Sequence, residues 1–133
     1  MSERSRVLLV EDDDATLETF ATALREAGFA VWVARDGTAA MEVAEELDWS
    51  ADVLVVDLRL GEGPRGDQFV AYWRTRSKRD TPVIVVTALE RGRELAKPIR
   101  AAIVRPKPVG VDELVSAVRL FARPPRQNSE GTD

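Results

Sequence analysis

The chain of 133 residues contains no cysteine and no histidine. The absence of cysteine excludes disulfide bonds and thiolate metal sites. The absence of histidine excludes imidazole-bound zinc and both Ser-His-Asp and Cys-His catalysis. Any chemistry that this chain performs must therefore use carboxylates, hydroxyls and lysine.

Long hydrophobic runs and an excess of basic residues are also missing. No apolar stretch approaches the roughly 20 residues that a helix needs to span a bilayer. The 19 Lys and Arg residues are outnumbered by 23 Asp and Glu residues, for a formal net charge of -4. No basic stretch is interleaved with aromatic residues, as is common in proteins that bind nucleic acids. We therefore expect a cytoplasmic protein that contacts neither membranes nor nucleic acids directly.

The length fits one domain with a single core. Short apolar runs alternate with helix-like segments five times, a pattern typical of a parallel sheet with helices on both faces. The predicted strands are 6–10, 30–34, 53–56, 82–86 and 101–104.

Four helices are predicted from N-cap residues, glycines and apolar stripes at helical spacing. They begin near Asp13-Asp14, Thr38, Gly66-Asp67 and Val111. A further helix, the fourth in chain order, would lie between Ala88 and Ile99. This segment has a poor apolar stripe, an internal glycine and a proline, so we expect that fourth helix to be short or irregular. We expect one domain over 6–122, preceded by a short lead (1–5) and followed by a flexible tail (123–133).

Polar residues follow four of the predicted strands. Glu11 and Asp12 follow the first strand, Asp57 the third, Thr87 the fourth and Lys107 the fifth. Asp57 also precedes a glycine-rich loop, so we expect its carboxylate to be presented rather than buried. Ligands of such sheets bind beyond the carboxyl ends of the strands. Three acids without histidine predict a hard oxygen site suited to Mg²⁺, next to a hydroxyl and an ammonium that could contact a phosphoryl group.

Taken singly, each of these residues has a simpler interpretation. Asp13 or Asp14 is expected to be an N-cap, and other acids at strand ends could be caps too. Thr87 could be an ordinary β-branched strand residue, and Lys107 a solvated loop lysine. Only the combination favours a functional site.

The motifs occur in a fixed order along the chain: Val10-Glu11-Asp12, Val56-Asp57-Leu58-Arg59-Leu60, Val86-Thr87-Ala88 and Lys107-Pro108. On these motifs, residues 5 to 122 resemble the receiver domain of two-component response regulators. That family has a flavodoxin-like, doubly wound (βα)5 fold with a five-stranded parallel sheet.

The resemblance implies that Asp57 accepts a phosphoryl group from a sensor histidine kinase, a histidine phosphotransfer protein or a small phosphodonor. Thr87 and Lys107 would contact that group. The Mg²⁺ ligands would be Asp12, Asp57 and the backbone carbonyl of Arg59, with Glu11 acting through a water molecule. A downstream protein partner is implied but not identified, and a homodimer is compatible with the resemblance.

The chain departs from the family pattern in the loop after Asp57, at Val104 and in the fourth helix. Gly66 comes about one residue later than is usual, and Gly61 stands where a proline is common. Val104 replaces the tyrosine or phenylalanine that typically rotates inward when the receiver is phosphorylated. The segment between Thr87 and Lys107 is about two residues shorter than usual, in agreement with a short fourth helix.

Two positions and one peptide bond are also informative through the resemblance. Arg59 and Leu89 occupy positions where receiver side chains influence the access of water to the acyl phosphate. We hypothesise that they slow self-dephosphorylation. The bond between Lys107 and Pro108 is expected to be cis, because that turn commonly is in the family.

Three classes of function fit these observations. The leading hypothesis is a stand-alone receiver that binds a partner protein after phosphorylation. A phosphorylation-independent interaction module is the alternative that Val104 and the short fourth helix favour. An aspartyl-nucleophile phosphohydrolase is disfavoured, because such enzymes usually carry a second acid where this chain has Arg59.

Overall fold

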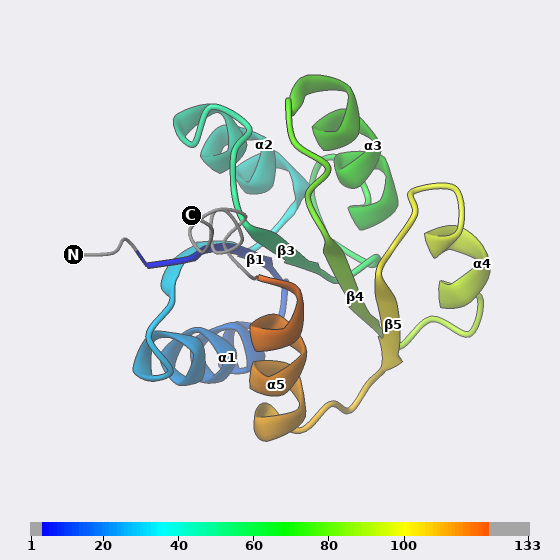
Figure 1. Ribbon diagram of the computed structural model, residues 1–133. Coiled ribbons are helices and arrows are strands. Elements are labelled where there is room, and N and C mark those ends of the chain that lie inside the picture. Colours follow the sequence, from blue (N-terminus) through cyan, green and yellow to red (C-terminus); the bar gives the residue numbers. More distant parts are fainter. Residues whose placement is uncertain (1–3, 123–133) are drawn as a thin grey trace.

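The computed structural model describes residues 4–122, which form one five-stranded parallel sheet with five helices. The strand order is β2-β1-β3-β4-β5 (Figure 1). The strands are β1 (Arg6–Val10), β2 (Ala30–Ala34), β3 (Val53–Val56), β4 (Val83–Thr87) and β5 (Ile103–Pro106). The predicted doubly wound α/β fold is confirmed. The predicted boundaries hold for β1, β2 and β3. Both ends of β4 lie one residue later and both ends of β5 two residues later than predicted, so Thr87 is the last residue of β4 rather than the residue after it. The predicted tail over 123–133 lies outside the described residues.

Helices cover both faces of the sheet. In Figure 1, α1 (Asp14–Glu26) and α5 (Val111–Phe121) cover one face, and α2 (Gly37–Glu46) and α3 (Gly66–Arg76) cover the other. The fourth helix, α4 (Gly92–Ala96), lies beside the edge strand β5. Its five residues confirm the prediction of a short helix.

The core has two layers because successive side chains of a strand point to opposite faces of the sheet. Leu8 and Val10 pack in the layer under α2 and α3, while Val7 and Leu9 pack in the layer under α1 and α5. The central strands are buried on both faces, so they read as continuous apolar runs rather than alternating ones. This explains why the run Val53–Val56 is a strand without any polar residue.

Aspartate caps determine where the first two helices begin after their strands. The Asp13 carboxylate accepts hydrogen bonds from the backbone N–H and the hydroxyl of Thr16, at 2.9 and 2.6 Å. Asp36 accepts from the backbone N–H of Ala39 at 2.7 Å. The predicted N-cap at Asp13 is therefore confirmed. Only Glu11 and Asp12 remain between the end of β1 and this cap, which places both at the edge of the sheet.

Candidate functional site

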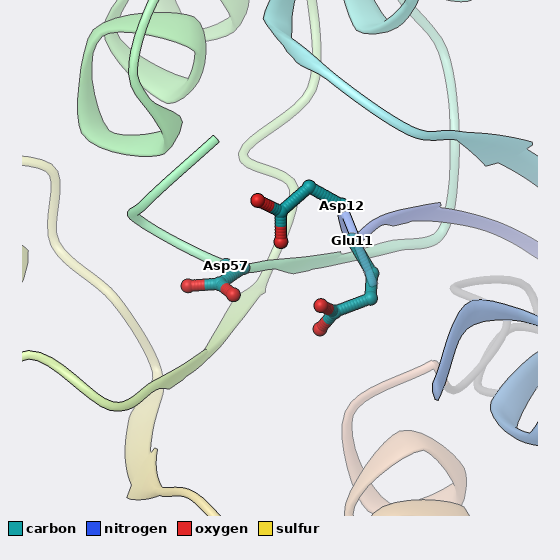
Figure 2. A group of neighbouring side chains, drawn as sticks. All are labelled: Glu11, Asp12 and Asp57. Atoms are coloured by element: carbon teal, nitrogen blue, oxygen red, sulfur yellow. The ribbon is translucent and has the colours of Figure 1, made fainter. Parts of the chain in front are cut away.

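Three carboxylates meet at the carboxyl edge of the sheet. Glu11 and Asp12 follow β1, and Asp57 follows the neighbouring strand β3, whose Val56 pairs with Val10. The backbone N–H of Asp57 donates to the Val10 carbonyl at 3.0 Å, which continues the register beyond the strand. One oxygen from each carboxylate lies within 4.8 Å of the others. Figure 2 shows the three side chains extending from these two strand ends into the same region.

The expectation that Asp57 is presented rather than buried is wrong. Only 5% of Asp57 and 2% of Glu11 are exposed, whereas Asp12 is exposed. Lys107 contributes to this burial, because it contacts both acids from the end of β5. Its Nζ lies 2.7 Å from Asp57 Oδ2 and 2.9 Å from Glu11 Oε1.

Lys107 compensates the charge of this buried pair. Burial raises the pKa of the Glu11 carboxyl above its ordinary value, although hydrogen bonds from Lys107 and from the Asp13 backbone N–H oppose that rise. Burial by itself would lower the pKa of Lys107. Hydrogen bonds to Asp57 and Glu11 outweigh burial, so the Lys107 pKa is raised and the ammonium stays charged.

The second oxygen of Asp57 is bound by the loop that follows it. The backbone N–H of Arg59 donates to Asp57 Oδ1 at 3.1 Å, a local turn that aspartate favours. Each carboxylate oxygen of Asp57 therefore has its own donor, and the side chain is held in one orientation. The carbonyl of Arg59, a predicted metal ligand, belongs to the same turn.

Gly66 positions Asp57 from the far end of this loop, through a contact that the sequence did not indicate. A Cβ at Gly66 would lie 2.0 Å from the backbone oxygen of Asp57, closer than any side chain could approach. The Gly66 N–H also donates to the Leu58 carbonyl at 3.0 Å. The sequence indicates only that this glycine lies where the loop ends and α3 begins.

Thr87 lies at the end of β4 and is 2% exposed. Its hydroxyl accepts a hydrogen bond from the Leu89 backbone N–H at 3.2 Å. Its carbonyl accepts from the Lys107 backbone N–H at 3.0 Å, which holds the ends of β4 and β5 together. The peptide bond between Lys107 and Pro108 is cis, as expected.

A pocket of about 280 Å³ lies beside Thr87, between β4, β5 and α4. Val104 lines it, at the position where receivers typically carry an aromatic residue. The first residue of α4, Gly92, approaches Thr87 so closely that a Cβ there would lie 2.6 Å from Thr87 Cγ2. The start of the short helix thus packs directly against the threonine.

A comparison with protein-family models decides the classification. The model described as the response regulator receiver domain matches residues 7–119. The chain belongs to the response regulator receiver domain family. The acidic cluster fits the divalent cation that these domains generally bind, because its three carboxylates can supply hard oxygen ligands within 4.8 Å of one another.

Curated relatives and solved structures agree with this classification. The chain is 33% identical over 121 residues to the transcriptional regulatory protein CpxR of Escherichia coli K12, covering 90% of this chain and 50% of that protein. It is 34% identical over 119 residues to the transcriptional regulatory protein PdtaR of Mycobacterium tuberculosis, covering 86% of this chain and 55% of PdtaR. The chain thus spans about half the length of these relatives.

Solved receiver domains share the fold. The receiver domain of the Francisella response regulator 1452 is 26% identical, with a TM-score of 0.77 and coverage of 90% of this chain and 97% of that one. A CheY-like receiver from Methanospirillum hungatei JF-1, at 19% identity, has a TM-score of 0.80 and covers 96% and 99% of the two chains. The predicted family and the flavodoxin-like fold are confirmed. Within residues 4–122, no helix is both long and apolar enough to cross a membrane.

Proposed function

We propose that Asp57 of this receiver domain accepts a phosphoryl group and that the phosphorylated domain then binds a partner protein. The donor would be a sensor histidine kinase, a histidine phosphotransfer protein or a small phosphodonor. The observation that carries this proposal is the fixed, buried carboxylate of Asp57. One of its oxygens faces Lys107, the other faces the Arg59 N–H, and two further acids stand beside it.

In the proposed reaction a carboxylate oxygen of Asp57 attacks phosphorus in line with the leaving group. A new O–P bond forms and gives an acyl phosphate. At the same time the P–N bond of a phosphohistidine, or the P–O bond of a small donor, breaks, and its electron pair stays on the donor. Positioning and charge neutralisation account for most of the catalysis in such transfers. Lys107 would neutralise the transferred group, and the Thr87 hydroxyl could donate to one of its oxygens.

Mg²⁺ would be held by Asp12, Asp57 and the Arg59 carbonyl, with Glu11 acting through water. When bound, it would neutralise charge shared by Asp57 and the phosphoryl oxygens. Lys107 pairs with Glu11 and Asp57 and neutralises part of their charge.

Incubation with acetyl phosphate and Mg²⁺, followed by intact-mass analysis, tests the proposal. We expect a single phosphoryl adduct that does not form when EDTA removes Mg²⁺. The absence of an adduct, with acetyl phosphate and with a panel of kinases, would favour the phosphorylation-independent interaction module, the alternative that Val104 and the short α4 indicate. Rapid consumption of acetyl phosphate without an adduct would favour a phosphohydrolase.

Asp12→Asn should weaken Mg²⁺ binding. Asp12 is the exposed acid of the cluster and has no share in the Lys107 bridge, so its substitution removes a ligand charge and leaves the buried pair intact. Loss of an outer-shell partner alone costs about 10- to 100-fold in metal affinity, so we expect at least about a tenfold weaker Kd. Isothermal titration calorimetry measures it, with Asp14→Asn as a charge-matched control. Equal affinities of the two variants would contradict the assignment of Asp12.

Replacing Arg59 and Leu89 together by Asn and Ser should shorten the half-life of the acyl phosphate several-fold. The backbone N–H of Arg59 already contacts the Asp57 carboxylate, and Leu89 contacts the Thr87 hydroxyl, so both side chains begin beside the site. Smaller polar side chains would admit the hydrolytic water. Decay of the adduct is followed by intact mass, with Arg91→Asn as a control for the lost charge. A half-life that lengthened in the double variant would contradict the hypothesis.

Four expectations stay predictions. They are the stand-alone action of the receiver, its cytoplasmic location, a homodimer and the absence of direct contacts with nucleic acids.

A further inference from the structure

The loop between Asp57 and α3, residues 58–65, is docked on the N-terminus of α2. The backbone N–H groups of Gly37 and Thr38 both donate to the Glu62 carbonyl, at 2.9 and 3.2 Å. These are the first two N–H groups of α2, which have no partner within the helix. The loop therefore caps α2 through its backbone.

This contact leaves no room for a side chain on either partner. A Cβ at Gly37 would lie 2.0 Å from the Pro64 backbone oxygen. Gly63 has a φ of +82°, and a Cβ there would lie 2.4 Å from Thr38 Oγ1. The close approach requires glycine on both sides, and it gives a physical reason for the glycine-rich, lengthened loop of this chain.

The other end of the loop is attached to Asp57. The Arg59 N–H donates to the Asp57 carboxylate, and the Gly66 N–H donates to the Leu58 carbonyl. Leu58 and Leu60 are buried in the core layer that also contains residues of α2. The loop is therefore anchored at the acceptor carboxylate, in the core and on α2, so a movement at Arg59 would act on a segment that is also bound to α2.

We infer that phosphorylation of Asp57 is transmitted through loop 58–65 to the N-terminus of α2. The inference rests on the proposed function, because it needs a phosphoryl group on Asp57. That group adds negative charge and acceptor oxygens beside the Arg59 N–H, which strengthens the anchor at this end of the loop. Because the loop is also held in the core, the stronger anchor at Arg59 restrains residues 58–65 and tightens the contact between Glu62 and α2.

Site-resolved hydrogen exchange, measured by NMR under acetyl phosphate and Mg²⁺, tests the inference, while intact mass reports the adduct in the same sample. Coupling between two sites typically amounts to about 5- to 150-fold, so exchange of the Gly37 and Thr38 amides should slow at least about fivefold. The Gly28 amide, which donates to the Arg25 carbonyl at the end of α1, is the internal control and should not change.

The two proposals fail in different ways in this experiment. An adduct accompanied by unchanged or faster exchange at Gly37 and Thr38 overturns the inference and leaves the phosphorylation of Asp57 standing. Absence of an adduct overturns the proposed function, and the inference with it.

A pair of glycine variants tests the same coupling in the opposite direction, from the contact with α2 back to Asp57. Gly63→Ala places a side chain at a positive φ and against Thr38, whereas Gly61→Ala in the same loop meets nothing within 4 Å. Because coupling is reciprocal, Gly63→Ala should accumulate less adduct at a given acetyl phosphate concentration and lose the exchange response. Gly61→Ala should keep both. A folded Gly63→Ala variant with the normal response overturns the inference, and if this variant does not fold, the exchange measurement on the unmodified chain decides.

Discussion

Asp57→Asn should accept no phosphoryl group from acetyl phosphate under conditions in which the unmodified chain forms a full adduct. An amide cannot act as the nucleophile that a carboxylate provides, and the other two acids of the cluster are not held between Lys107 and the Arg59 N–H as Asp57 is. Intact-mass analysis in the presence of Mg²⁺ measures this directly. The expected loss is complete.

The Asp57→Asn variant should stay folded, because asparagine has nearly the same size and its side-chain oxygen can still accept from Lys107. It also removes one of the two buried negative charges, which repel each other. Asp14→Asn is the matched control. Asp14 belongs to the same acidic run but is exposed and pairs with Arg35, so this variant should phosphorylate normally. An adduct on Asp57→Asn would show that another residue is the acceptor.

Gly66→Ala should lower the free energy of unfolding by about 3 kcal/mol, because overpacking typically costs about 1–3 kcal/mol and this clash involves backbone rather than a flexible side chain. The added Cβ would lie 2.0 Å from the Asp57 backbone oxygen and 2.8 Å from Leu58 Cα. Helix propensity alone predicts that Gly66→Ala raises the free energy of unfolding, since alanine is favoured over glycine by roughly 0.5–1 kcal/mol inside a helix. The sign of the change therefore distinguishes the close contact from helix propensity.

Urea unfolding followed by the fluorescence of the buried tryptophans Trp49 and Trp73 measures this effect. Gly61→Ala is the control, since nothing lies within 4 Å of its new methyl group and its φ is not in the left-handed region. Surface changes of this kind usually stay within about 0.5 kcal/mol. Similar unfolding free energies for the two variants would contradict the positioning role of Gly66. A folded Gly66→Ala sample should also phosphorylate more slowly, because the Asp57 backbone must move.

The sequence by itself determined the succession of strands and helices along the chain and the residues at the strand ends. This was possible because parallel strands that are buried on both faces leave apolar runs such as Val53–Val56, and because residues after such runs must lie at one edge of the sheet. The shortness of α4 was also readable, since Gly92 and Pro98 interrupt a segment without an apolar stripe. These are local properties, and they place Glu11, Asp12 and Asp57 at one edge of the sheet, whereas the pairing of β1 with β3 brings the three acids together.

Only the tertiary structure decided that Asp57 is buried and how its loop is attached. Lys107, 50 positions further along the chain, covers the carboxylate, and this depends on β5 pairing with β4. Gly66 against the Asp57 carbonyl, and Gly63 against Thr38, are likewise contacts between backbones that are brought together by packing. No periodicity or propensity encodes such distances. They arise when the loop after β3 folds back between the end of its own strand and the start of α2.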